Sequence, residues 1–156
     1  SYIRVGRYGE PTYDALEAPR LGRARMVRDG RDVAVVTSGD VAPEAVSALD
    51  TLAAEGIEPI HMQMHTVKPF DSAALEALAL RAHTIIVVEE HFPDGGLASS
   101  VLAWKATSGA SVTVQRLGPP HALALGGLHR AELRRRFAYD AEAIADACRA
   151  AWQRKD

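Results

Sequence analysis

The stretch from Thr84 to Ser100 places the strongest constraint on the fold of this 156-residue chain. Four apolar residues at 85–88 lead into Glu89-Glu90-His91, and Pro93-Asp94 and the pair Gly95-Gly96 come next. The small and apolar residues after this pair are typical of a helix start. The pattern predicts a buried strand whose carboxyl end meets a glycine turn and a helix N-terminus. In open α/β sheets, ligands and partners usually lie at this edge.

Strands and helices alternate along the rest of the chain. We expect strands at 24–28, 32–39, 59–67, from His83 onward and at 111–117, and helices beginning near Pro43, Asp71 and Gly96 and spanning 128–137 and 140–154. The last four strands alternate with helices, so they should be parallel, with helices on both faces of the sheet. The Asp29-Gly30 dipeptide is typical of a hairpin turn, which makes the strand at 24–28 antiparallel to the next.

Composition excludes several classes of protein. Apolar residues make up 47% of the chain and charged residues 24%, which indicates one globular domain with a core. The net charge of −2 lacks the basic excess of nucleic-acid binders, and no apolar run reaches membrane-spanning length. We therefore expect no nucleic-acid partner and no membrane partner. The single cysteine, Cys148, rules out an internal disulfide, which is compatible with the cytoplasmic location that we expect, and its alanine neighbours at helical spacing favour a buried thiol.

The Glu89-Glu90-His91 segment is a candidate metal site. Adjacent side chains of a strand point to opposite faces, so only Glu89 and His91 could bind the same ion. No third ligand lies within sequence reach, which makes the signal weak. A structural role at the end of the strand is the favoured interpretation.

Two glycine-containing loops could bind an anion through backbone N–H groups. One is Gly95-Gly96, and the other is the segment 37–41, Thr-Ser-Gly-Asp-Val. Neither has the glycine spacing of a dinucleotide-binding loop or the lysine of a P-loop. A tight turn that caps a helix is the favoured interpretation of segment 37–41, and a weak anion site at either loop stays open.

Nucleophilic catalysis is disfavoured. No serine lies in a G-x-S-x-G elbow, and Ser99 and Ser100 fall within a helix turn. His61 and His65 lie on one side of the strand predicted at 59–67, which favours buried or interface histidines over a catalytic base. We expect the run 134–136, three arginines close to Glu132, to form a solvated helix face.

Several motifs, taken in order, resemble the C-terminal domain of transketolase-like, thiamine-diphosphate-dependent enzymes. This superfamily includes transketolases, deoxyxylulose-phosphate synthases and the β subunits of 2-oxoacid dehydrogenases. The strongest match is the segment 87–91 together with 95–97. Other matching segments are 31–39, 55–57, 65–71 and 138–144, and segment 2–7 resembles the last strand of the preceding pyrimidine-binding domain.

The resemblance implies a three-layer α/β/α fold with a five-stranded mixed sheet in the order 1-3-2-4-5. The first strand is antiparallel to the others in this fold, and it is not the neighbour of the second. The resemblance also implies that the chain consists of two segments. Residues 1–22 would be the tail of the pyrimidine-binding domain with a linker arm, and residues 23–156 would be the transketolase C-terminal-like domain.

No catalytic, cofactor-binding or metal-binding residue can be carried over from the family. The G-D-G…N metal motif of the pyrophosphate-binding domain and the glutamate of the pyrimidine-binding domain are missing from the sequence. Thiamine diphosphate and Mg²⁺ are expected in the complete enzyme, which would transfer a two-carbon ketol unit between sugar phosphates. This chain, a fragment or a split subunit, is expected to assemble with those two domains and to form a homodimer.

The resemblance assigns a structural role to the 89–96 turn. We expect Glu89, Glu90, His91, Gly95 and Gly96 to lie at an interdomain or dimer interface, with His65 and Lys68 nearby. Two alternatives stay open. The chain could be a 2-oxoacid dehydrogenase β-type domain that docks on an acyltransferase partner, or a free-standing regulatory module that binds a small anion.

Overall fold

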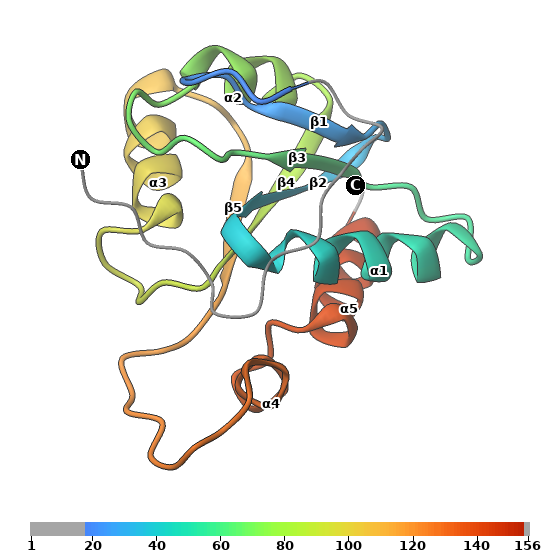
Figure 1. Cartoon of the computed structure of the whole chain (residues 1–156). Coiled ribbons are helices and arrows are strands. Elements are labelled where there is room, and N and C mark those ends of the chain that lie inside the picture. The colour runs from blue at the N-terminus through green and yellow to red at the C-terminus, as the bar shows by residue number, and fades with distance from the viewer. Residues whose placement is uncertain (1–17, 155–156) are drawn as a thin grey trace.

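The computed structural model describes residues 18–154, which form one five-stranded mixed sheet with helices on both faces (Figure 1). The strands are β1 (Arg25–Arg28), β2 (Asp32–Ser38), β3 (Ile60–Gln63), β4 (Ala82–Glu89) and β5 (Thr113–Leu117). The helices are the 3₁₀ turn η1 (Gly39–Val41), α1 (Ala42–Ala53), α2 (Ser72–Ala79), α3 (Leu97–Ser108), α4 (Arg130–Arg136) and α5 (Ala141–Trp152). The strand order is β1-β3-β2-β4-β5, with β1 antiparallel and all other pairs parallel. The predicted topology is confirmed.

The Asp29-Gly30 turn joins two antiparallel strands, as predicted, but these strands are not neighbours in the sheet, as the resemblance implied. β3 lies between β1 and β2, because β2 is buried on both faces and pairs with two parallel strands, whereas the four-residue β1 takes the edge. The connection passes the start of β3, where the N–H of Arg31 donates to the carbonyl of Glu58 at 3.0 Å. A Cβ at Gly30 would lie 2.3 Å from the same carbonyl oxygen, so only glycine fits.

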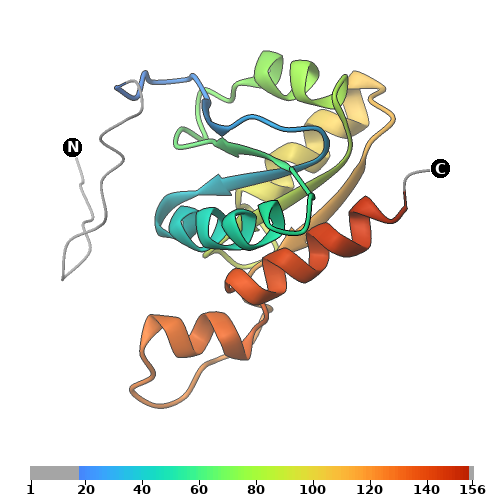
Figure 2. The same ribbon diagram turned by 90° about the vertical axis from the view of Figure 1, so that its right-hand side faces the viewer.

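Two apolar layers enclose the sheet. Helices α1 and α5 cover one face, while α2 and α3 cover the other (Figure 2). Alternate residues of β2 divide between the layers: Val33 and Val35 pack towards α1 and α5, and Ala34 and Val36 pack towards α2 and α3. Burial on both faces explains why the central strands are continuous apolar runs, as parallel sheets require.

Helix ends follow the predicted signals. Asp71 accepts a hydrogen bond from the N–H of Ala74 at 3.2 Å, and Asp140 accepts one from Ala143 at 3.2 Å. Gly109 ends α3 with a φ of 69°. The strand predicted at 59–67 is shorter and spans only Ile60–Gln63. Beyond Gln63 it has no strand to pair with on either side, because β2 turns into η1 there and the antiparallel β1 starts opposite Gln63.

Two further predictions concern the burial of Cys148 and the absence of a membrane-spanning segment. Cys148 is fully buried, as predicted, and burial raises the pKa of its thiol to about 12. Within residues 18–154, no helix has both the length and the apolar character that a membrane span requires.

A loop at residues 118–129 and the short helix α4 extend away from the sheet before the chain returns to α5 (Figure 1). All residues from 121 to 127 are exposed to solvent. We call this segment the β5–α4 loop.

Candidate functional site

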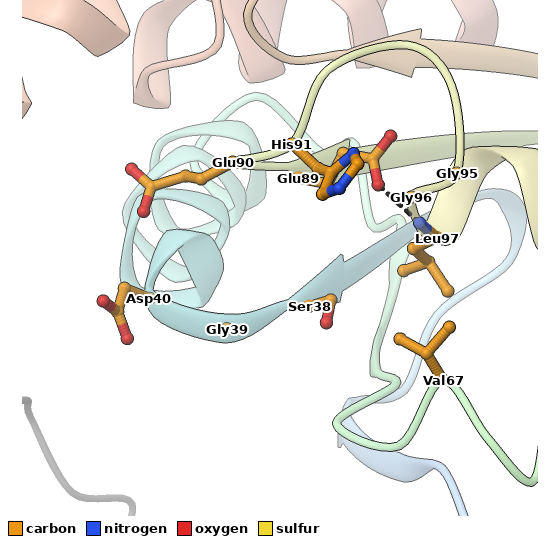
Figure 3. Close-up of a pocket in the computed structure, with 10 residues that line it drawn as sticks. All are labelled: Ser38, Gly39, Asp40, Val67, Glu89, Glu90, His91, Gly95, Gly96 and Leu97. Carbon is orange, nitrogen blue, oxygen red and sulfur yellow. Dashed lines mark hydrogen bonds between the residues drawn. The ribbon is translucent and has the colours of Figure 1, made fainter. Parts of the chain in front are cut away.

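The candidate site lies at the carboxyl ends of the neighbouring strands β2 and β4, from which the chain continues to opposite faces of the sheet. β2 leads into α1 on one face, whereas β4 leads into α3 on the other. The last residues of these two strands, Ser38 and Glu89, are partners in the parallel ladder. Crevices in open α/β sheets form at such a switch point. A cleft of about 480 Å³ lies here, lined by Ser38, Gly39, Asp40, Val67, Glu89, Glu90, His91, Gly95, Gly96 and Leu97 (Figure 3).

The structure brings five of the seven predicted site residues together in this cleft. They are Glu89, Glu90, His91, Gly95 and Gly96. His65 and Lys68 are not among the lining residues, although Val67, which lies between them in sequence, is one. The Nδ1 atom of His65 lies 2.9 Å from the Thr66 hydroxyl, and Lys68 is exposed.

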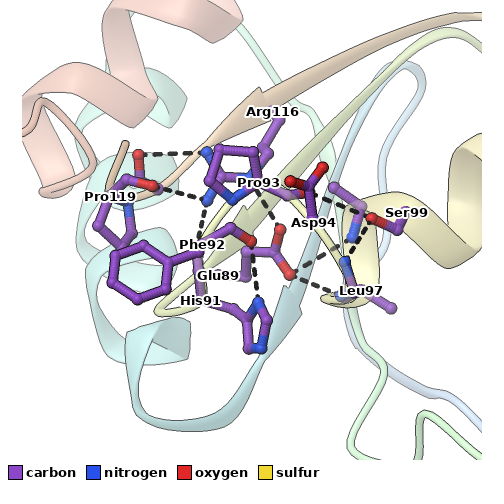
Figure 4. Close-up of polar contacts among 12 residues, drawn as sticks. Glu89, His91, Phe92, Pro93, Asp94, Leu97, Ser99, Arg116 and Pro119 are labelled. Atoms are coloured by element: carbon purple, nitrogen blue, oxygen red, sulfur yellow. Dashed lines mark hydrogen bonds and ion pairs between the residues drawn. The ribbon is translucent and has the colours of Figure 1, made fainter. Parts of the chain in front are cut away.

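Glu89 caps helix α3. Its carboxylate is only 3% exposed, and Oε2 accepts hydrogen bonds from the N–H groups of Leu97 at 2.6 Å and Ala98 at 3.4 Å (Figure 4). These N–H groups belong to the first turn of α3, which has no partner for them within the helix. A carboxylate at this position also interacts favourably with the helix dipole. The other oxygen, Oε1, lies 2.9 Å from Nε of Arg116.

Arg116 joins the turn after β4 to the turn after β5. Besides Glu89, its guanidinium donates to the carbonyl of His91, to that of Pro119 at 3.0 Å and to that of Gly118 at 3.3 Å (Figure 4). Sequence reasoning missed this residue. The available signal was a charged side chain inside the apolar strand at 111–117, directly before Gly118.

The glycine pair fits the turn tightly around Glu89. Gly95 has a φ of 81°, a conformation that favours glycine, and its N–H donates to the Ser99 hydroxyl at 3.0 Å. The Ser99 hydroxyl donates to the carbonyl of Pro93 at 3.1 Å, so this serine braces the turn. A Cβ at Gly96 would lie 2.3 Å from Glu89 Oε2 and 3.0 Å from Nδ1 of His91.

Replacing Gly96 with alanine is expected to lower the free energy of unfolding by about 2 kcal/mol, the usual scale for overpacking a filled site. The added methyl group would displace the Glu89 carboxylate from the α3 N–H groups. Gly127→Ala is the matched control, because nothing lies within 4 Å of a Cβ there. Urea denaturation of both variants measures the difference, and equal midpoints would contradict a tight turn.

Glu90 points to the opposite side of the strand from Glu89 and belongs to an ion-pair cluster. Arg134 donates to Glu90 at 2.8 Å, to Glu44 at 2.9 Å and to the carbonyl of Asp40 at 3.0 Å. Arg130, one helical turn earlier, lies 2.6 Å from the Asp40 carboxylate. The cluster ties α4 to α1, η1 and the end of β4.

The prediction of a solvated face was therefore wrong for Arg134, which is only 8% exposed, although Arg135 and Arg136 are exposed. Burial alone would lower the pKa of Arg134, but the carboxylates of Glu90 and Glu44 outweigh it and raise the pKa. A buried arginine with two carboxylate partners holds its charge and fixes the position of α4.

The cleft does not fit a diphosphate or a metal ion. Its lining contains three carboxylates and no lysine or arginine, and Glu89 already occupies the N–H groups at the start of α3. Across residues 18–154, no group of three or more His, Cys, Asp or Glu could hold a metal. Both oxygens of Glu89 accept hydrogen bonds, so a metal ion at the Glu89–His91 pair would have to compete with these donors. The hydrogen bonds of Glu89 stabilise the turn that connects β4 to α3.

The fold is a three-layer α/β domain, and Glu89 at its switch point is held by hydrogen bonds from α3 and Arg116. The sequence model of the family described as "Transketolase, C-terminal domain" matches residues 22–144, so the chain belongs to this family. It is 35% identical over 148 residues to the 1-deoxy-D-xylulose-5-phosphate synthase of Syntrophotalea carbinolica, covering 95% of this chain and 23% of the relative. It is 38% identical over 136 residues to the synthase of the same name from Anaeromyxobacter dehalogenans, covering 83% and 21%.

A solved structure supports the same assignment. It is described as a split gene transketolase, inactive beta4 tetramer, and it superposes with a TM-score of 0.84 at 28% identity. The match covers 99% of this chain and 50% of that chain. The chain thus spans about a quarter of the synthases it matches and half of the split gene transketolase.

Proposed function

We propose that this chain is the non-catalytic C-terminal domain of a transketolase-like, thiamine-diphosphate-dependent enzyme, and that it supports domain and subunit assembly. The single observation that carries the proposal is the engagement of Glu89. At the edge where α/β enzymes place their reactive groups, its carboxylate is used on both sides to hold helix α3 and Arg116. This use of the carboxylate supports a structural role over proton transfer or metal binding.

The family suggests two candidate reactions for the complete enzyme. We propose the transfer of a two-carbon ketol unit between sugar phosphates, with thiamine diphosphate and Mg²⁺ held by the pyrophosphate- and pyrimidine-binding domains. The similarity to the split gene transketolase supports this reaction. A second candidate is the synthase reaction that forms a deoxyxylulose phosphate, which the higher identities of 35% and 38% favour.

The proposed partners are the two cofactor-binding domains and a second copy of this chain. The description of the split gene transketolase as a beta4 tetramer supports association between copies. We propose that the turn at 89–96 lies near one of these interfaces, with His65 and Lys68 at its border. His91 and Gly95 are among the exposed residues of the turn and remain accessible to a partner.

The two alternatives have less support. A small anion would compete with Glu89 for the N–H groups of Leu97 and Ala98, and it would face the carboxylates of Asp40 and Glu90 in the cleft. This arrangement disfavours the regulatory anion-binding module. The relatives described above are synthases and a transketolase, so they give no support to docking on an acyltransferase.

Calorimetry and co-purification test the proposal together. The full chain titrated with thiamine diphosphate and Mg²⁺ is expected to give no binding heat. When mixed with a polypeptide of the same organism that carries both cofactor-binding domains, the chain is expected to co-elute with it and to support ketol transfer. Low-micromolar binding of thiamine diphosphate by the chain alone, or failure to associate with the catalytic domains, would overturn the proposal.

A further inference from the structure

The segment from Leu128 to Phe137, which contains α4 and which we call the α4 segment, has little apolar contact with the rest of the domain. It lies outside the helical layers that cover the sheet (Figure 2). Within α4 only Arg134 is buried, and Leu133 is half-buried. Phe137, directly after the helix, packs partly buried against the layer of α1 and α5. Segments with few buried apolar contacts open most readily in native proteins.

Arg134 is the central polar attachment of the α4 segment. It donates to the carboxylates of Glu90 and Glu44 and to the carbonyl of Asp40, which come from the end of β4, from α1 and from η1. A buried ion pair adds little net stability, because the cost of removing both charges from water offsets their attraction. Loss of one partner is nevertheless costly, because the other charge is left unpaired. The attachment of the α4 segment therefore depends on this one side chain.

Both ends of the α4 segment have a backbone suited to rotation. Before it, the β5–α4 loop contains Gly126, with a φ of 102°, and Gly127, and nothing lies within 4 Å of a Cβ at either position. After it, the exposed Ala138 has a φ of 52°, a left-handed conformation that is strained for any residue with a Cβ. Hinges in proteins are commonly a few residues in loops or at element ends. The strain at Ala138 favours opening, and the contacts of Arg134 oppose it.

We propose that the α4 segment opens as one unit about these two ends, and that Arg134 holds it closed. The carboxylates that it contacts belong to the site described above, because Glu90 and Asp40 line the cleft of about 480 Å³ at the switch point. Opening takes Arg134 away from Glu90 and Arg130 away from Asp40. The cleft then presents both carboxylates without these cations. The α4 segment is thus a conformational device that sets the charge of the cleft towards a partner.

Hydrogen exchange of single amides in the full chain, measured without urea and at low urea concentrations, tests the proposal. The hydrogen-bonded amides of Leu133 and Phe137 are expected to exchange about 100-fold faster than those of β4, with little urea dependence, because opening exposes little surface. Arg134→Met should raise their exchange rate by about a further 30-fold, since two carboxylates lose their shared cation. Arg135→Met is the matched control, because Arg135 is the exposed neighbour, and it should exchange like the wild type. Circular dichroism checks that both variants are folded.

Each outcome decides the inference. Faster exchange of the α4 amides in Arg134→Met, with the β4 amides still better protected, supports it. One common rate and one urea dependence for α4 and β4 would mean that α4 opens only when the whole domain unfolds, which overturns it. Fast exchange in α4 that Arg134→Met leaves unchanged is fraying that Arg134 does not control, and it also overturns the inference. If Arg134→Met does not fold, Glu90→Gln replaces it with an expected rise of about tenfold, and an unchanged rate in that variant overturns the inference.

Discussion

Replacing Glu89 with alanine is expected to lower the free energy of unfolding by about 3–5 kcal/mol, the range measured when one partner of a buried ion pair is removed. Two groups lose their partner at once. The first N–H groups of α3 lose their acceptor, and the guanidinium of Arg116, whose side chain is 19% exposed, loses its carboxylate. The remaining carbonyl contacts of Arg116 do not neutralise its charge.

Asp94→Ala is the matched control for this variant. Asp94 belongs to the same turn and carries the same charge, but its side chain is 89% exposed, and its only ion pair recorded within the described residues is with His121. Exposed pairs contribute at most about 1 kcal/mol, so Asp94→Ala should stay within that limit. Urea denaturation of both variants measures the difference. A Glu89→Ala loss no larger than that of Asp94→Ala would contradict the capping role.

Glu89→Gln separates the two functions of the carboxylate. The amide keeps one oxygen that can accept from the N–H of Leu97, but it presents an NH₂ group or a neutral oxygen to Arg116. Its stability should therefore fall between that of the wild type and that of the alanine variant. The ratio of the stability loss in Glu89→Gln to that in Glu89→Ala reports how much of the loss comes from removing the negative charge.

The strand order and the place of the site could be predicted, whereas the partners of the site residues could not. The resemblance carried the order 1-3-2-4-5, but the local Asp29-Gly30 signal alone favoured a hairpin with β2. Turn chemistry reports only that the chain reverses direction. It carries no information about β3, which inserts between the two strands after thirty further residues.

The contacts of Arg116 and Arg134 were not predicted, because their partners lie far away in the sequence. Glu89 and Arg116 are 27 residues apart, and Arg134 lies 44 residues after Glu90. A run of three arginines on a short helix is usually solvated, and sequence periodicity gave no reason to separate Arg134 from its neighbours. Only the return of the chain through α4 places that side chain against the carboxylates of Glu44 and Glu90.

His61 is the second group with a large expected effect. Its side chain is completely buried on β3, and one ring nitrogen, Nε2, lies 2.9 Å from the Thr37 hydroxyl. Burial, with a smaller contribution from the positive charge of Arg28 on the neighbouring β1, lowers the pKa of His61 to about 4. The folded protein therefore holds a neutral imidazole at pH values at which an unfolded chain, with a histidine pKa near 6.5, begins to bind a proton.

Between pH 6.5 and pH 4, the unfolded state binds more protons at this site than the folded state, so the free energy of unfolding should fall as the pH is lowered. The shift from 6.5 to about 4 corresponds to roughly 3 kcal/mol across that window. His61→Gln removes the titrating group and should flatten this part of the pH dependence, even if it also lowers stability at pH 7. Denaturation curves at half-unit steps of pH provide the comparison, and equal slopes for His61→Gln and the wild type would show that His61 takes up its proton without opposing the fold.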